Sequence, residues 1–106
     1  MDYNTRVVSN NPVWTGSTTA ATQNFADKDT PEQLVVPGWA RYMILQPLQA
    51  SCRVIARTTG ATAPADGDPG IEVGAGGSLE VALGPQADIW IQVPNDNDDV
   101  ECTFFS

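Results

Sequence analysis

The acidic and amide residues from Asn95 to Asp99 come closest to a metal site in this sequence. They place oxygen ligands at alternate positions, as calcium-binding loops do. The sixth residue of such a loop is normally glycine and the twelfth glutamate, whereas this chain has Val100 and Ser106. The sequence therefore favours a solvated, charge-rich turn over a calcium site, and we expect neither a metal nor a cofactor.

Catalytic groups are difficult to assemble from these residue types. The chain has no histidine, which removes the commonest general base and every Ser-His-Asp or Cys-His triad. The stretch from Gly74 to Ser78 resembles a phosphate loop, but it lacks the lysine and precedes a predicted strand rather than a helix. No two acids are placed to face each other across a groove, as glycoside hydrolysis requires. We expect that the protein is not an enzyme.

Cys52 and Cys102 are too few for a disulfide framework. The N-terminus has no apolar run of signal-peptide length, and no segment approaches the roughly 20 apolar residues of a membrane helix. We therefore expect synthesis in a cytoplasm. In that reducing compartment both thiols are predicted to be free, buried, small apolar groups, and a disulfide is the alternative.

The net charge restricts the classes of partner. Asp and Glu number 13 and Lys and Arg 5, giving a net charge of −8. Such a field repels phosphate backbones and anionic lipids, so neither nucleic acid nor a membrane is expected as a partner. A basic protein surface is compatible with this charge.

The candidate binding residues are aromatic, aliphatic and basic. An exposed tryptophan can anchor a protein interface or stack on a sugar, and the alternative is that it caps the edge of a core. Arg53 and Arg57 lie on one face of a predicted strand, where they suit cross-strand ion pairs or, alternatively, salt bridges to another subunit. The predicted protein-interface residues are Trp14, Phe25, Arg53, Ile55, Arg57 and Trp90.

Two-residue alternation places most of these side chains on strands. In residues 51–59, Cys52, Val54 and Ala56 face one way, and Ile55 faces the other with the two arginines. In residues 87–93, the isoleucines and Val93 point inward and Trp90 points outward. Further strands are predicted by the same patterns in residues 3–8, 34–36, 40–46, 71–73, 78–83 and 100–105.

Residues 9–33 differ from the rest because they are rich in Thr, Ala and polar residues and have few apolar anchors. We interpret residues 1–33 as an N-terminal strand and an extended polar arm, and residues 34–106 as the body of a single domain. About eight short strands, with turn signals roughly every 8–12 residues, favour an all-β antiparallel β-sandwich or jelly roll.

Several motifs follow one another along this body in the same order as in one class of proteins. They are Ser-Cys-Arg-Val-Ile, Thr-Gly-Ala-Thr-Ala-Pro, Gly-Gly-Ser-Leu-Glu-Val, Asp-Ile-Trp-Ile and Val-Glu-Cys-Thr-Phe-Phe. In this order, from Gly38 to Phe105, the chain resembles small structural proteins of tailed-bacteriophage virions. The most similar class is that of the capsid decoration or cement proteins, whose members are often β-sandwiches or jelly rolls bound as trimers to the outer capsid.

The resemblance implies a virion protein that is synthesised in the host cytoplasm, binds the major capsid protein and stabilises the shell. It further implies a homotrimer, with Ile55 and Trp90 on flat outer strand faces at the subunit contacts. The alternative is a carbohydrate-binding or receptor-binding β-sandwich module, in which tryptophans stack on sugars beside Asn and Asp side chains.

Overall fold

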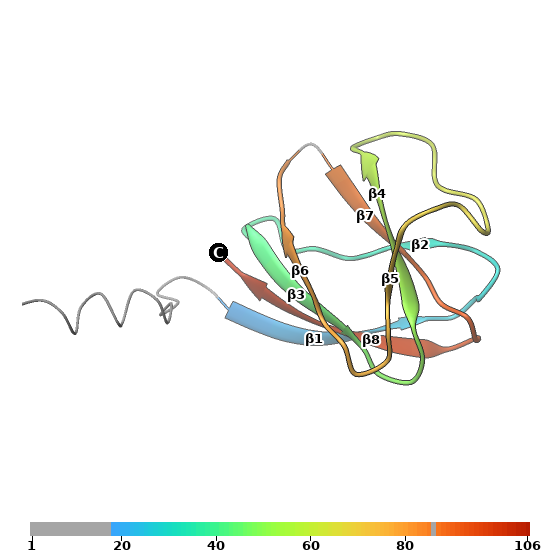
Figure 1. Ribbon diagram of the computed structural model, residues 1–106. Coiled ribbons are helices and arrows are strands. Elements are labelled where there is room, and N and C mark those ends of the chain that lie inside the picture. Colours follow the sequence, from blue (N-terminus) through green and yellow to red (C-terminus); the bar gives the residue numbers. More distant parts are fainter. Residues whose placement is uncertain (1–17, 86) are drawn as a thin grey trace, which may run out of the picture.

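The structure is a computed structural model that describes residues 18–85 and 87–106. In this range eight strands form two four-stranded antiparallel sheets (Figure 1). The strands are β1 (Thr18–Phe25), β2 (Glu32–Gln33), β3 (Tyr42–Pro47), β4 (Cys52–Thr58), β5 (Ile71–Val73), β6 (Leu79–Ala82), β7 (Ala87–Gln92) and β8 (Asp98–Phe105). The first sheet has the order β1-β8-β3-β6 and the second the order β2-β7-β4-β5. The predicted all-β antiparallel sandwich is confirmed.

Alternation along the strands builds the core between the two sheets. On β8, Val100, Cys102 and Phe104 are all buried and face the interior. On the opposite sheet, Ile89 and Ile91 of β7 are also buried. Because successive strand residues point to opposite faces, this spacing of apolar residues is sufficient to place the inner surface of each sheet.

The part of the chain that the structure describes contains no helix able to cross a membrane.

The polar segment predicted as an arm is in part a strand of the sandwich. β1 pairs with β8 over its whole length, from Thr18 opposite Phe105 to Phe25 opposite Asp98. Phe25 is only 3% exposed and belongs to the core. The predicted boundary between arm and body after residue 33 is therefore wrong, because residues 18–33 belong to the sandwich. Phe25 is a core residue rather than an exposed interface residue. The predicted strand at residues 3–8 and Trp14 lie outside the described residues.

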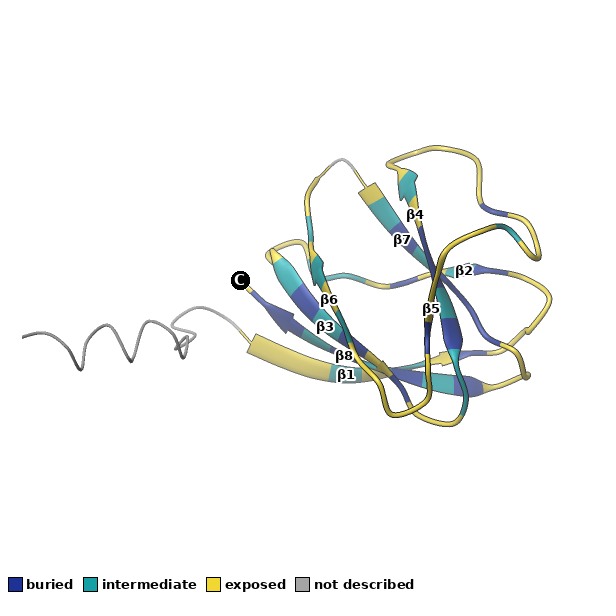
Figure 2. Cartoon of the chain, in the orientation of Figure 1, coloured by how far each residue is buried: buried dark blue, intermediate teal, exposed yellow. Residues whose placement is uncertain are grey.

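The loop of residues 59–70 joins β4 to β5 (Figure 2) and packs against the outer face of the second sheet, and we call it the covering loop. Ile55, predicted to be exposed on this face, is only 1% exposed. Gly70 at the end of the loop lies directly over it, since a Cβ added to Gly70 would be 2.8 Å from Ile55 Cγ1. The prediction of a flat, open face at Ile55 is therefore wrong, because the chain's own loop covers this side chain.

Candidate functional site

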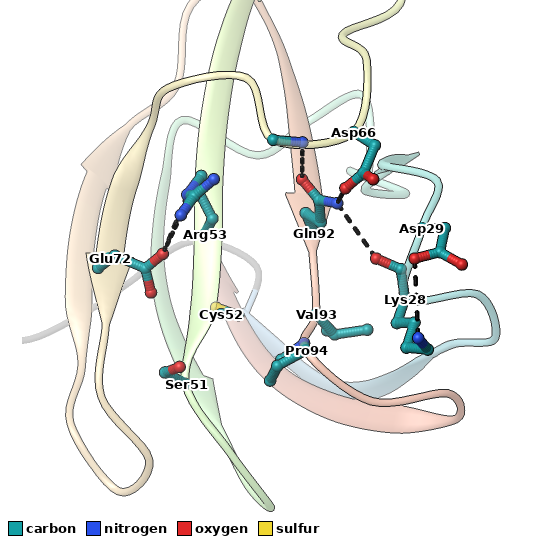
Figure 3. A pocket seen from close by; sticks show the side chains of 11 residues that line it. Lys28, Asp29, Ser51, Cys52, Arg53, Asp66, Glu72, Gln92, Val93 and Pro94 are labelled. Carbon is teal, nitrogen blue, oxygen red and sulfur yellow. Dashed lines mark hydrogen bonds and ion pairs between the residues drawn. The ribbon is translucent and has the colours of Figure 1, made fainter.

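A row of polar side chains crosses the outer face of the second sheet at the end where β4 begins (Figure 3). Arg53 of β4 is in register with Glu72 of β5 on one side and with Gln92 of β7 on the other. Its Nε donates to Glu72 Oε1 at 2.9 Å, and its Nη2 lies 2.8 Å from the same oxygen. The predicted cross-strand ion pair of Arg53 is confirmed.

Gln92 joins this row to two loops. Its side chain is buried, and its Oε1 accepts a hydrogen bond from the backbone N–H of Gly67 at 3.1 Å. Its Nε2 donates to the carbonyl of Lys28 at 3.1 Å and to Asp66 Oδ1. A buried amide needs such partners, since an unpaired one costs free energy. Gln92 thus ties both the covering loop and the β1–β2 connection to the sheet.

Arg57 holds the same loop further along β4. Its Nη2 lies 3.0 Å from Asp68 Oδ2, and that oxygen also accepts the backbone N–H of Ala65 at 2.9 Å. Arg57 therefore pairs with a loop residue rather than with Asp88, its neighbour in register on β7. Asp88 instead accepts the backbone N–H of Gly60 at 3.3 Å. Arg53 Nη1 also donates to the carbonyl of Asp68 at 3.3 Å, so both arginines contribute to holding the loop. Partly exposed ion pairs of this kind each stabilise by only about 0–1 kcal/mol.

A cavity of about 280 Å³ lies beside the polar row. Lys28, Asp29, Arg53, Asp66 and Glu72 supply its charges. These charges are engaged within the protein: Lys28 lies 3.8 Å from Asp29, Arg53 contacts Glu72, and Asp66 accepts from Gln92. The pocket is therefore a junction between two loops and a sheet. Its chemistry is that of structural hydrogen bonds and ion pairs.

The two cysteine side chains point into the core from opposite sheets, Cys52 from β4 and Cys102 from β8. Both are buried and free, as predicted. Burial raises the pKa of Cys52 to about 11 and that of Cys102 to about 12, because a thiolate is poorly solvated there. Both thiols are therefore neutral at physiological pH, and a neutral thiol is a poor nucleophile.

These thiols predict a loss of stability in alkali. The unfolded chain releases their protons near the ordinary pKa of 9.0, whereas the folded protein keeps them to about pH 11 and 12. The free energy of unfolding should therefore fall as the pH rises above 9. Urea unfolding from pH 8 to 11 would measure the slope. The double variant Cys52→Ala/Cys102→Ala should show a shallower fall, and equal slopes would contradict the prediction.

The acidic side chains in the turn at Asn95–Asp99 form hydrogen bonds with different partners. Asp96 accepts the backbone N–H of Lys28 at 3.0 Å, and Asp99 accepts from Asn24 and Gln49. Asp98 is buried and faces Asn95 Nδ2 at 3.4 Å. Among residues 18–85 and 87–106, no three acidic or cysteine side chains are grouped to hold a metal ion. The hydrogen bonds agree with a structural turn that joins β7 to β8.

A larger groove of about 480 Å³ lies at the opposite end of the second sheet. The segment from Leu34 to Arg41 forms one side, and the turn between β6 and β7 contributes Gly84 and Pro85. Trp39 lines the groove and is 39% exposed. The predicted interface residues did not include Trp39. The Pro37-Gly38 turn immediately before it was the signal that could have indicated an exposed position.

The structure brings four of the six predicted interface residues together. Ile55 and Trp90 are in register on β4 and β7, and Arg53 and Arg57 flank Ile55 on the same face. This surface lies at the covering loop, and Trp90 is half-buried with its indole Nε1 buried and without a hydrogen-bond partner among the described residues. Within this cluster, Arg53, Ile55 and Arg57 contact the covering loop. Whether any of these residues also contacts another protein stays a prediction.

No family model matches the sequence, and no curated protein matches it. A solved structure from Bacillus endospore appendages, which form a family of disulfide-linked pili, is similar over 90% of this chain and 92% of that chain. The sequence identity is 11% and the TM-score is 0.46. The resemblance to phage decoration proteins stays a prediction.

Proposed function

We propose that this protein is a non-enzymatic structural subunit that works by binding other proteins. In the finer form of the proposal it is a decoration protein, which binds the major capsid protein on the outside of a virus particle and stabilises the shell. The support for the finer form is the order of motifs from Gly38 to Phe105, together with an acidic net charge of −8 that suits a basic docking surface.

The observation that carries the proposal is the exposure of two apolar side chains, Val35 and Trp39, in the segment beside the larger groove, residues 34–41. Val35 in this segment is 73% exposed and Trp39 is 39% exposed. Large apolar side chains in one exposed segment are typical of surfaces that bind other proteins.

The backbone of this segment is held firmly although its side chains are exposed. Gln23 of β1 accepts the N–H of Val35 at 3.0 Å and donates to its carbonyl at 2.8 Å. Arg41 donates its N–H to the carbonyl of Phe105 at 2.8 Å, and Leu34 donates to Ile89 at 2.8 Å. Because the segment is already ordered, a partner that binds Val35 and Trp39 has less conformational entropy to remove.

The same groove favours one second candidate, a carbohydrate-binding module. An exposed tryptophan beside polar groups is a platform on which a sugar ring can stack, and Gln33, Arg41 and Asp88 also line this groove. Protein docking ranks first because Val35 of the same segment is exposed outside the groove lining, where a sugar bound in the groove would not contact it.

Sedimentation with capsids would test the proposal. Shells assembled from the major capsid protein encoded nearest this gene would be mixed with the protein and pelleted. We expect saturable binding, weakened at least about tenfold by Trp39→Ala, since buried aromatic anchors often contribute 2 kcal/mol or more, roughly thirtyfold. Leu48→Ala, which truncates an exposed apolar side chain elsewhere, should bind as the unmodified protein does.

Two results would contradict the proposal. One is the absence of binding to the shells at any protein concentration. The other is selective binding on a glycan array that Trp39→Ala abolishes, which would instead support the carbohydrate-binding module.

A further inference from the structure

The free edge of β1 differs from the other three sheet edges. β2 is two residues long, and β5 has three residues, one of them Glu72. β6 has four residues, includes Glu80 and runs into Gly84-Pro85. Short strands, charged residues and nearby prolines are the features by which proteins prevent edge-to-edge pairing. Three of the four edges are therefore protected.

β1 has none of these features. It is eight residues long and contains no charged residue, no proline and no glycine. Among the described residues it pairs with β8 alone, so its other side has no strand partner. Residues 18–20 and 22 are exposed, with Ala21 half-buried (Figure 2). A long, uncharged edge of this kind is a template for a further strand.

We propose that β1 pairs with β1 of a second copy of this chain. A two-fold axis perpendicular to the sheet makes the two strands antiparallel and joins the first sheets of both copies into one continuous sheet. On the outer face the side chains that meet are threonine and alanine from each copy, and Thr–Thr pairs across strands are favourable.

The charge distribution permits a second copy to occupy this edge. With a net charge of −8, two copies repel each other across most of their surfaces. Across β1 the nearest acids on the outer face are Glu101 and Asp99 of β8. The Glu101 carboxylates of the two copies would be about three strand spacings apart, roughly 14 Å. This exceeds the screening length of about 8–10 Å at ordinary salt, so β1 is an edge where self-association meets little repulsion.

A pair of matched variants tests the pairing. Ala20 on β1 and Ala82 on β6 are both exposed and lie on the outer face of the same sheet, at its opposite edges. Ala20→Lys places a charge on each copy at the proposed contact, whereas Ala82→Lys adds the same charge at the protected edge. Sedimentation equilibrium over a range of protein concentrations reports the mass of each variant. Thermal unfolding confirms that each is folded.

The unmodified protein should shift with concentration from the monomer mass of 11.3 kDa toward twice that value. Ala20→Lys should weaken this association at least about tenfold, and Ala82→Lys should leave it within about twofold. Thr22→Lys, a second exposed position on β1, should repeat the effect of Ala20→Lys.

Three outcomes would overturn the pairing: a monomer at every concentration, equal effects of Ala20→Lys and Ala82→Lys, or a mass of three chains. The last would support the homotrimer implied by the phage resemblance. The test uses this protein alone, so its result is independent of capsid binding.

Discussion

Replacing Phe25 with alanine is expected to lower the free energy of unfolding by about 3–5 kcal/mol, the usual cost of deleting a buried phenyl ring. Phe25 is the last residue of β1 and packs in the core between the sheets. Since domains are stable by only about 5–15 kcal/mol, this loss is a large fraction of the total. Urea unfolding followed by tryptophan fluorescence would measure it.

The matched control lies on the same strand. Thr22 is exposed and points away from the core, so Thr22→Ala should change the stability by no more than about 0.5 kcal/mol. If Phe25→Ala cost less than about 1 kcal/mol, β1 would not belong to the cooperatively folded unit. The interpretation of this segment as a polar arm would then be correct after all.

The second large effect is expected at Gly70, where the covering loop meets the sheet. A Cβ at this position would lie 2.5 Å from the carbonyl oxygen of Val54 and 2.8 Å from Arg53 Cγ and Ile55 Cγ1. The backbone oxygen cannot move away without disturbing β4, so Gly70→Ala should cost about 1–3 kcal/mol by overpacking. The loop should also lift from the sheet and be cut faster by a protease.

Gly74→Ala is the control for this substitution. A Cβ at Gly74 meets no atom within 4 Å, and the residue does not have a positive φ. Its stability and its rate of proteolysis in residues 59–70 should match those of the unmodified protein. An unchanged stability of Gly70→Ala would mean that the loop does not pack on Ile55 as described.

The sequence was most informative where apolar and polar residues alternate. The inner faces of β7 and β8 follow from Ile89, Ile91, Val100 and Phe104 because each strand turns every second side chain to the same side. β1 was missed because this rule needs an apolar face. Its residues 18–24 are threonine, alanine, glutamine and asparagine, and pairing with β8 makes them a strand.

In the candidate site, only the contacts between neighbouring strands could be predicted from the sequence. The pair of Arg53 and Glu72 follows from two neighbouring strands. The contacts of Gln92 with Asp66 and Gly67 depend on how a polar loop folds back over the sheet, and no local pattern marks that docking. For the same reason the sequence places Ile55 on an open outer face, available to a subunit contact. A residue on the outer face of a sheet is exposed only if no loop covers it.

The place of β8 in the first sheet has a consequence for how the protein is made. β8 lies between β1 and β3, so the two earlier strands have no shared partner until residues 98–105 have left the ribosome. Pairing of β1 with β8 joins residues near both ends of the described chain, and contacts so distant in sequence slow folding. During synthesis the uncharged β1 segment therefore stays without its strand partner, and in this interval it is prone to aggregation.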